Sequence, residues 1–303
     1  MFNHTDKIYL IIIPFILSNC IYRVPIKTKK IVIHSCSLEK PTQTKKSENK
    51  PQITVFVHGT KLILPPVDKL FFHCKSGFHK AQEIRNLLVH GKIAFLLDKS
   101  DPDHYPMQHF YFNCWSGKLD FKEREEAARA LYKNLTELIE KYQKEYGERP
   151  YLRVIGHSHG CNVILDLSAI KPENSTLSID QLILLACPVQ KATQHLIMDP
   201  MFNSVYSLYS MADPIQVLDP QGLYTYTRKK NIKSSLFSQR RFNPNSKLKQ
   251  VQIKLNRRAP GHKEFIFPHM IKALPSIINA MDEWNELDNA PIEKRYMIKV
   301  MTK

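Results

Sequence analysis

The stretch Leu152-Arg-Val-Ile-Gly-His-Ser-His-Gly-Cys161 decides the fold of this chain. An apolar run leads into Gly156-His-Ser-His-Gly160, and the run Asn162-Val-Ile-Leu-Asp-Leu-Ser-Ala169 follows at once. The first run is typical of a buried parallel strand and the last of a helix. The glycines permit a sharp turn, because a strained residue at its apex needs small neighbours. The pattern predicts that the Ser158 hydroxyl projects at a helix N-terminus, where backbone N–H groups can bind an oxyanion.

A bare Gly-x-Ser-x-Gly match can also be a turn without chemistry, so the surrounding sequence has to decide. The strand-turn-helix context favours a nucleophilic serine. A second signal lies upstream, where Ile53-Thr-Val-Phe-Val57 predicts a short strand that ends in His58-Gly-Thr60. His58 is expected to hold this turn by local hydrogen bonding rather than to take part in catalysis.

A serine nucleophile needs an acid and a base downstream, in the chain order Ser, Asp or Glu, His. Val205-Tyr-Ser-Leu-Tyr209 predicts a strand, and Asp213 follows it, just before Pro214. An Asp-Pro pair is also common in ordinary turns. Its place directly after a strand favours Asp213 as the acid that orients an imidazole.

The base is expected in the loop after the last strand. Val251-Gln-Ile-Lys-Leu255 alternates like a strand, and a loop from Asn256 to His262 follows. His269 competes for the role, but Pro268-His269 is typical of the start of a helix. His262 is therefore favoured as the general base.

In their order along the chain, the His58 turn, the Ser158 turn, Asp213 and His262 resemble the pattern of the α/β-hydrolase superfamily, and in particular of its lipase and esterase members. The resemblance covers about residues 51–285, and Leu152–Cys161 is similar to the lipase-type serine signature. It implies an α/β-hydrolase fold, with a mostly parallel central sheet flanked by helices. It also implies a catalytic triad of Ser158, Asp213 and His262, and an oxyanion hole made by backbone N–H groups of His159, Gly59 and Thr60.

Two functions remain open at this point. One is hydrolysis of a lipid or other acyl ester through an acyl-enzyme, and the other is non-catalytic binding of anionic surfaces on a hydrolase scaffold. No cofactor is expected, because no phosphate loop, dinucleotide-binding turn or paired-cysteine zinc pattern occurs. No metal is expected either, since His157 and His159 point apart across a turn. The fold alone does not fix the substrate.

The charge is strongly positive, with 44 Lys and Arg against 28 Asp and Glu, a net +16. It is concentrated between Asp219 and Glu264, where twelve basic residues and no acidic residue occur. This basic stretch, residues 228–263, favours an anionic membrane surface as a partner, with aromatic residues such as Phe242 at the interface, and no nucleic acid is expected. The alternative is a solvated loop.

The first twenty residues are typical of a targeting segment. Lys7 precedes the apolar run Ile8–Leu17, which is too short to span a membrane comfortably. Leu17-Ser-Asn-Cys20 resembles a bacterial lipobox, although Asn19 departs from the usual small residue. We therefore expect export, with a lipid on Cys20, simple secretion or an uncleaved anchor as the alternatives. Cys74 and Cys114 could pair in an oxidising compartment.

Four parts are expected along the chain: a targeting segment (1–20), a polar Lys-rich linker (21–51), the hydrolase domain (52–287) and a C-terminal tail (288–303). Within the domain, residues 220–250 are expected to form a basic cap or loop insertion. A helical patch is expected around Lys80–Val89 and a helix after the capping pattern Asp120-Phe-Lys-Glu123. A closing helix is expected from Pro268 to Trp284, kinked or broken at Pro275.

Overall fold

A central sheet organises the protein in the computed structural model, which describes residues 28–34, 50–60, 75–84, 89–218, 238–283 and 295–301. Nine strands within these ranges lie in the order β1-β9-β8-β7-β6-β5-β2-β4-β3. In chain order they are β1 Thr28–His34, β2 Gln52–Val57, β3 Gly77–Lys80, β4 Phe110–Cys114, β5 Tyr151–His157, β6 Ile179–Leu185, β7 Phe202–Tyr209, β8 Leu248–Leu255 and β9 Arg295–Met301. Every neighbouring pair is parallel except β3 with β4. The expected mostly parallel sheet is confirmed.

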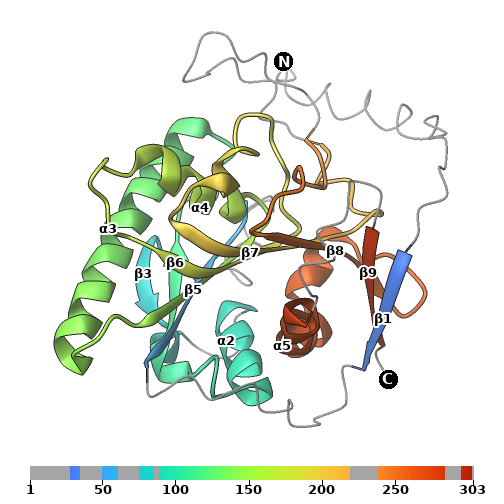
Figure 1. Ribbon diagram of the computed structural model, residues 1–303, viewed down its shortest axis with the longest axis horizontal. Helices are drawn as coiled ribbons and strands as arrows, with labels where there is room; N and C mark the ends of the chain where they lie inside the picture. The colour runs from blue at the N-terminus through green and yellow to red at the C-terminus, as the bar shows by residue number, and fades with distance from the viewer. Residues whose placement is uncertain are drawn as a thin grey trace, which may run out of the picture.

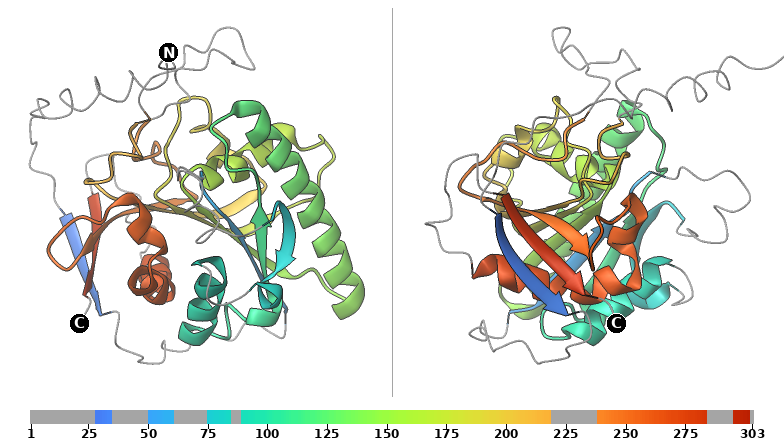
Figure 2. Two further views of the ribbon diagram at one scale, coloured as in Figure 1. Left: turned by 180° about the vertical axis from the view of Figure 1, so that it is seen from behind. Right: turned by 90° about the vertical axis from the view of Figure 1, so that its right-hand side faces the viewer.

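Helices cover both faces of the sheet, as Figures 1 and 2 show. One face carries α3 (Phe121–Tyr146) and α4 (His159–Ile170), and the other carries α2 (Val89–Ser100) and α5 (Pro268–Asp282). A separate buried apolar cluster lies under each helix pair. The chain therefore has the three-layer α/β-hydrolase fold that the sequence predicts. No helix of the described ranges is long and apolar enough to cross a bilayer.

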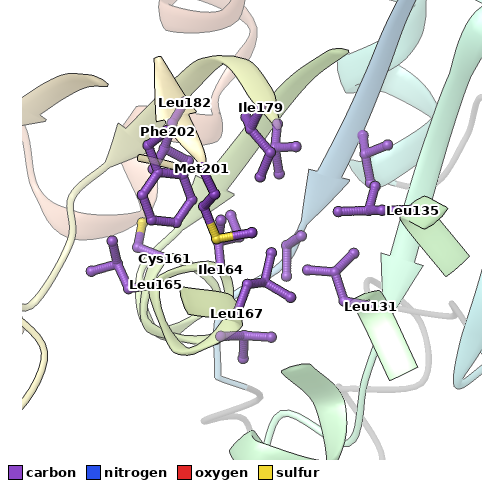
Figure 3. Packing of buried hydrophobic residues seen from close by; sticks show 14 of the residues in the cluster. Leu131, Leu135, Cys161, Ile164, Leu165, Leu167, Ile179, Leu182, Met201 and Phe202 are labelled. Atoms are coloured by element: carbon purple, nitrogen blue, oxygen red, sulfur yellow. The ribbon is translucent and has the colours of Figure 1, made fainter. Parts of the chain in front are cut away.

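In the layer under α3 and α4, apolar residues at helical spacing pack against the sheet. Leu131 and Leu135 lie one turn apart on α3, in the same buried cluster as Ile164 of α4 and Leu182 of β6, and Figure 3 labels all four. All four side chains are fully buried. Burial of each stabilises the fold by about 1.5–3 kcal/mol relative to leaving it exposed. This layer fixes α4, and so the start of α4, against the sheet.

The helix α3 begins at the residue that its capping pattern predicts. The Asp120 carboxylate accepts a hydrogen bond from the Glu123 N–H at 3.0 Å, and Gly147 ends the helix with φ +79°. The Glu123 carboxylate accepts a hydrogen bond from the Lys118 ammonium at 2.6 Å.

The expected helical patch around Lys80–Val89 is not seen in its described part. Lys80 ends β3 and a 3-10 turn follows at Ala81–Glu83, while residues 85–88, before α2, lie outside the described residues. The antiparallel pairing of β3 with β4 overrides the local helical signal. Of the two outcomes expected at Pro275, a break is excluded, since α5 continues through it to Asp282.

The expected linker and C-terminal tail each contain a strand. β1 lies inside residues 21–51 and β9 inside 288–303, and the two pair in parallel at the edge of the sheet. The β-branched run Ile31-Val-Ile33 suits a strand, but its partner lies more than 260 positions away. As a result, Val251–Leu255 belongs to β8, and β8 is not the last strand. The expected targeting segment, residues 1–20, lies outside the described residues.

Candidate active site

The turn at Ser158 is as sharp as its glycines suggest. β5 ends at His157, α4 begins at His159, and Ser158 between them has φ +55° and ψ −132°. A Cβ on Gly160 would lie 2.4 Å from the carbonyl oxygen of Val57, and one on Gly156 would lie 2.7 Å from Ile164 Cδ1. Positive φ is unusual for a residue with a side chain, and such strain occurs mainly at functional sites. The packing around both glycines holds Ser158 in this conformation.

The structure brings Ser158, His262 and Asp213 into one hydrogen-bonded chain. His262 Nε2 lies 2.7 Å from Ser158 Oγ, and His262 Nδ1 lies 2.7 Å from Asp213 Oδ2. The three residues follow β5, β8 and β7 at the carboxyl edge of the sheet, where active sites of open α/β sheets lie. With Nδ1–H donated to the carboxylate, Nε2 is free to accept the serine proton.

The Asp213 side chain is 0% exposed, and both of its carboxylate oxygens form hydrogen bonds. Its Oδ2 faces His262, while Oδ1 accepts hydrogen bonds from the N–H groups of Ile215 at 2.9 Å and Gln216 at 3.3 Å. The Gln216 amide holds the loop in turn, because its Oε1 accepts from the Ser210 N–H and its Nε2 donates to the Cys187 carbonyl. The carboxylate is thus held in one orientation toward the imidazole.

Contacts on both sides fix His262. The N–H of Gly261 donates to Glu264 Oε2 at 2.6 Å, and the same carboxylate binds Arg258. His157 Nε2 donates to the carbonyl oxygen of His262 at 3.2 Å. His269 lies in the first turn of α5 instead, and its Nε2 has no partner. Of the two candidate bases, the structure places His262 against Ser158.

The His58-Gly-Thr60 turn lies directly beside the nucleophile. A Cβ on Gly59 would lie 2.6 Å from Ser158 Cβ and 3.2 Å from its Oγ. His159 is the first residue of α4, where N–H groups have no acceptor within the helix. The expected oxyanion donors, the N–H groups of His159 and of the Gly59-Thr60 turn, are therefore close to Ser158.

His58 holds the turn in one tautomer. Its Nδ1 lies 2.7 Å from the Gly59 carbonyl oxygen and donates to it, while its Nε2 accepts from the Trp115 N–H at 3.1 Å. The Trp115 indole N–H in turn donates to the His58 carbonyl at 2.7 Å. His58 therefore has the structural position expected of it, at the end of β2.

His159 is a buried neutral imidazole. Burial lowers its pKa to about 3, with smaller contributions from Arg124 and His262. Arg124 is itself buried and binds Asp166 Oδ2 at 2.9 Å and Gln190 at 2.8 Å. Among the described residues, no group of three or more His, Cys, Asp or Glu side chains is arranged to hold a metal ion.

Several residues that shape the site carry no recognisable sequence signal. Arg124 lies on a helix whose pattern predicted only core packing, and Trp115 and Gln216 lie in loops. Their buried positions become evident only in the tertiary structure. Gln216 gives the one weak sequence signal, because a polar side chain three positions after Asp213 can cap the turn that contains this residue.

The cysteines fall into two groups. Cys161 and Cys187 are buried free thiols, and burial raises the pKa of the Cys161 thiol. Cys114 is disulfide-bonded. Cys74, its expected partner, lies outside the described residues, as does Cys20.

Only part of the basic stretch falls within the described residues, from Ser238 onward. Arg240 Nη2 donates to the carbonyl oxygen of Asp213 at 3.0 Å. Phe242 is 2% exposed and belongs to the core under α3 and α4. The expectation of Phe242 at a membrane interface was wrong, because its ring fills the interior.

Comparisons with known proteins give distant similarities of fold. No family model and no curated protein matches the chain. Among solved structures, an arylesterase is similar at 12% identity, covering 77% of this chain and 75% of that one, with a TM-score of 0.43. The carboxylesterase EstE1, cloned from a metagenomic library, is similar at 11% identity, covering 80% and 82%, with a TM-score of 0.40. The Legionella pneumophila phospholipase PlaB is similar at 17% identity over 46% of this chain and 25% of that one, with a TM-score of 0.31. The chain thus spans about a quarter of the length of that phospholipase.

Proposed function

We propose that this protein is a serine hydrolase that cleaves a lipid or other acyl ester through an acyl-enzyme. The observation that carries the proposal is the chain Ser158–His262–Asp213, with 2.7 Å at both links. Free serine is a weak nucleophile at neutral pH, and an adjacent imidazole held by a carboxylate activates it.

In the proposed reaction, Ser158 Oγ attacks the ester carbonyl carbon while His262 Nε2 takes the hydroxyl proton. The N–H groups of His159 and of the Gly59-Thr60 turn bind the resulting oxyanion. The tetrahedral intermediate collapses, and the alcohol leaves with the proton from Nε2. Water then attacks the acyl-enzyme, His262 takes its proton, and the acid is released as the proton returns to Ser158.

A fluorophosphonate probe tests this function directly. The wild-type protein should be labelled at one site, and Ser158→Ala should abolish the labelling. Ser168→Ala is the matched control on α4, because the Ser168 hydroxyl only donates to the Leu165 carbonyl of its own helix. Unlabelled wild-type protein would instead favour the non-catalytic, surface-binding alternative. Esters of graded acyl length would then identify the substrate class.

The proposal includes a location for the enzyme. We infer export, with Cys20 as a lipid anchor or with simple secretion, and docking on anionic lipid through residues 228–263. A disulfide at Cys114 supports an oxidising compartment. The excess of basic residues supports attraction to anionic lipid, at about 1 kcal/mol per residue near the surface.

A further inference from the structure

One short segment, Ser238 to Arg241, carries three buried polar atoms that have no hydrogen-bond partner among the described residues. They are Oγ of Ser238 and Nε of both Arg240 and Arg241. Ser238 is only 5% exposed. Buried polar groups in native proteins are nearly always satisfied, so each exception calls for a physical explanation. A guanidinium Nε–H can only donate, so the two arginines call for an acceptor.

The charge of the two arginines is also unbalanced. In the described part of the chain neither one forms an ion pair: Arg240 donates to the Asp213 carbonyl, and Arg241 lies 5.9 Å from the centre of the Tyr209 ring. The Asp213 carboxylate is committed to His262 and to two backbone N–H groups. Burial lowers the pKa of Arg240, and attraction to Asp213 offsets only part of this effect.

The neighbouring sequence offers no carboxylate to offset this charge. From Pro220 to Lys263 the chain contains no Asp or Glu at all. Both arginines are half-buried, and adjacent guanidinium charges that form no ion pair among the described residues favour a bound anion. An anion from outside the chain would satisfy both the charge and the unpartnered donors.

The segment that presents these donors is firmly held. Gln239 pairs with Val189 through two backbone hydrogen bonds of 2.8 Å, and the Ser238 N–H donates to the Val217 carbonyl at 2.8 Å. The Gln250 side chain binds both the N–H and the carbonyl of Phe242. Ser238 and Arg240 flank the bridged residue Gln239, and the backbone bends at Arg240 and Arg241. Donors held in this way lose little entropy when they bind a ligand.

We propose that Ser238, Arg240 and Arg241 form a binding site for one oxyanion of the phosphate class, beside the loop that carries Asp213. Guanidinium groups match phosphate oxygens in a bidentate manner, and a serine hydroxyl supplies a further donor. The phosphate belongs to a lipid headgroup or is free in solution. The site is discrete, unlike the diffuse attraction of the basic stretch, and it does not depend on the serine chemistry.

Calorimetric titration of the full chain with inorganic phosphate, at constant ionic strength, tests the site. We expect saturable binding of one phosphate per chain, weakened at least about tenfold in the double variant Arg240→Gln, Arg241→Gln. Arg257→Gln removes an exposed arginine of the same basic stretch and should leave the affinity unchanged. Equal affinity in the wild type and the double variant would overturn the proposal, as would an equal loss in Arg257→Gln.

The single variant Arg241→Gln guards against a folding artefact. In the wild type, the Arg241 guanidinium makes no hydrogen bond or ion pair in the described residues. Without phosphate, the melting temperature of the variant should therefore be no lower than that of the wild type. With phosphate, the wild type should melt higher and the variant should lose most of that increase. An unchanged phosphate-dependent increase in the variant would contradict the site.

Competition separates the two sources of the anion. Vesicles that contain phosphatidic acid should displace phosphate if the site takes a headgroup, whereas vesicles of phosphatidylcholine alone should not. Absence of displacement by either vesicle assigns the site to free phosphate. Hydrolysis of a small soluble ester, measured in parallel, reports on the proposed enzyme independently of phosphate binding.

Discussion

The hydroxyl of Ser210 donates a hydrogen bond to the carbonyl oxygen of Pro260 at 2.6 Å. Ser210 is fully buried and lies three residues before Asp213, while Pro260 lies two residues before His262. The contact thus joins the loop of the acid to the loop of the base. It helps to set their separation independently of the hydrogen bond between the two side chains.

Ser210→Ala should therefore affect turnover as well as stability. Loss of the buried hydrogen bond should lower the free energy of unfolding by about 1–2 kcal/mol. Small displacements of catalytic groups can cost up to about 100-fold in rate, so kcat should fall by roughly 10-fold or more with little change in KM. Steady-state kinetics and chemical denaturation measure both effects. An unchanged kcat in a destabilised variant would show that the contact is structural only.

The triad variants should lose activity while they remain folded. Ser158→Ala and His262→Ala should each lower kcat by about three orders of magnitude or more. Asp213→Asn should be nearly as severe, because the imidazole loses the acceptor that fixes its tautomer. Ester hydrolysis measures the loss, and circular dichroism checks the fold. His269→Ala serves as the control, and its inactivity beside an active His262→Ala would reverse the assignment of the base.

Acid should destabilise the protein partly through His159. The pKa is about 3 in the folded state and about 6.5 in the unfolded chain, so only the unfolded state gains the proton between these values. Stability is therefore highest above pH 6.5 and falls as the pH is lowered toward 3. His159→Phe should lose less stability than the wild type between pH 7.5 and 5 in thermal melts. The exposed His195→Gln should behave like the wild type, and an equal loss in all three proteins would exclude His159 as the cause.

Lipidation can be tested at Cys20. If Leu17-Ser-Asn-Cys20 is processed as a lipobox, cells should attach labelled fatty acid to the wild-type protein and not to Cys20→Ala. Cys36→Ala controls for general effects of cysteine loss. A mature N-terminus beyond Cys20, read by mass spectrometry, would instead establish simple secretion.

The sequence predicts the site better than it predicts the edges of the sheet. Each member of the Ser158–His262–Asp213 chain follows an apolar strand, and the ends of parallel strands meet at one edge. Strand signals plus chain order were therefore enough to select three residues that lie within hydrogen-bonding distance. Selecting His262 over His269 rested on the proline that starts α5.

Pairing between distant segments was not predictable in the same way. β1 and its partner β9 lie at opposite ends of the sequence, and β3 pairs with β4 across an intervening helix. Contacts such as Ser210 with Pro260 depend on the relative placement of two loops, which no local pattern records. Burial of Phe242 likewise follows from the path of the chain, because its neighbours in sequence are basic and polar.

The pairing of β1 at the sheet edge sets how an anchored molecule would face its surroundings. β1 runs parallel to β9 and β8, so Thr28 lies at the amino edge of the sheet, opposite the edge that carries Ser158. Thr28 is eight positions after Cys20, a reach of at most about 28 Å. A lipid on Cys20 would keep the amino edge near its own bilayer and turn the catalytic edge outward. Residues 228–263, next to the catalytic edge at Arg240, would then dock on an anionic surface other than the bilayer that holds Cys20.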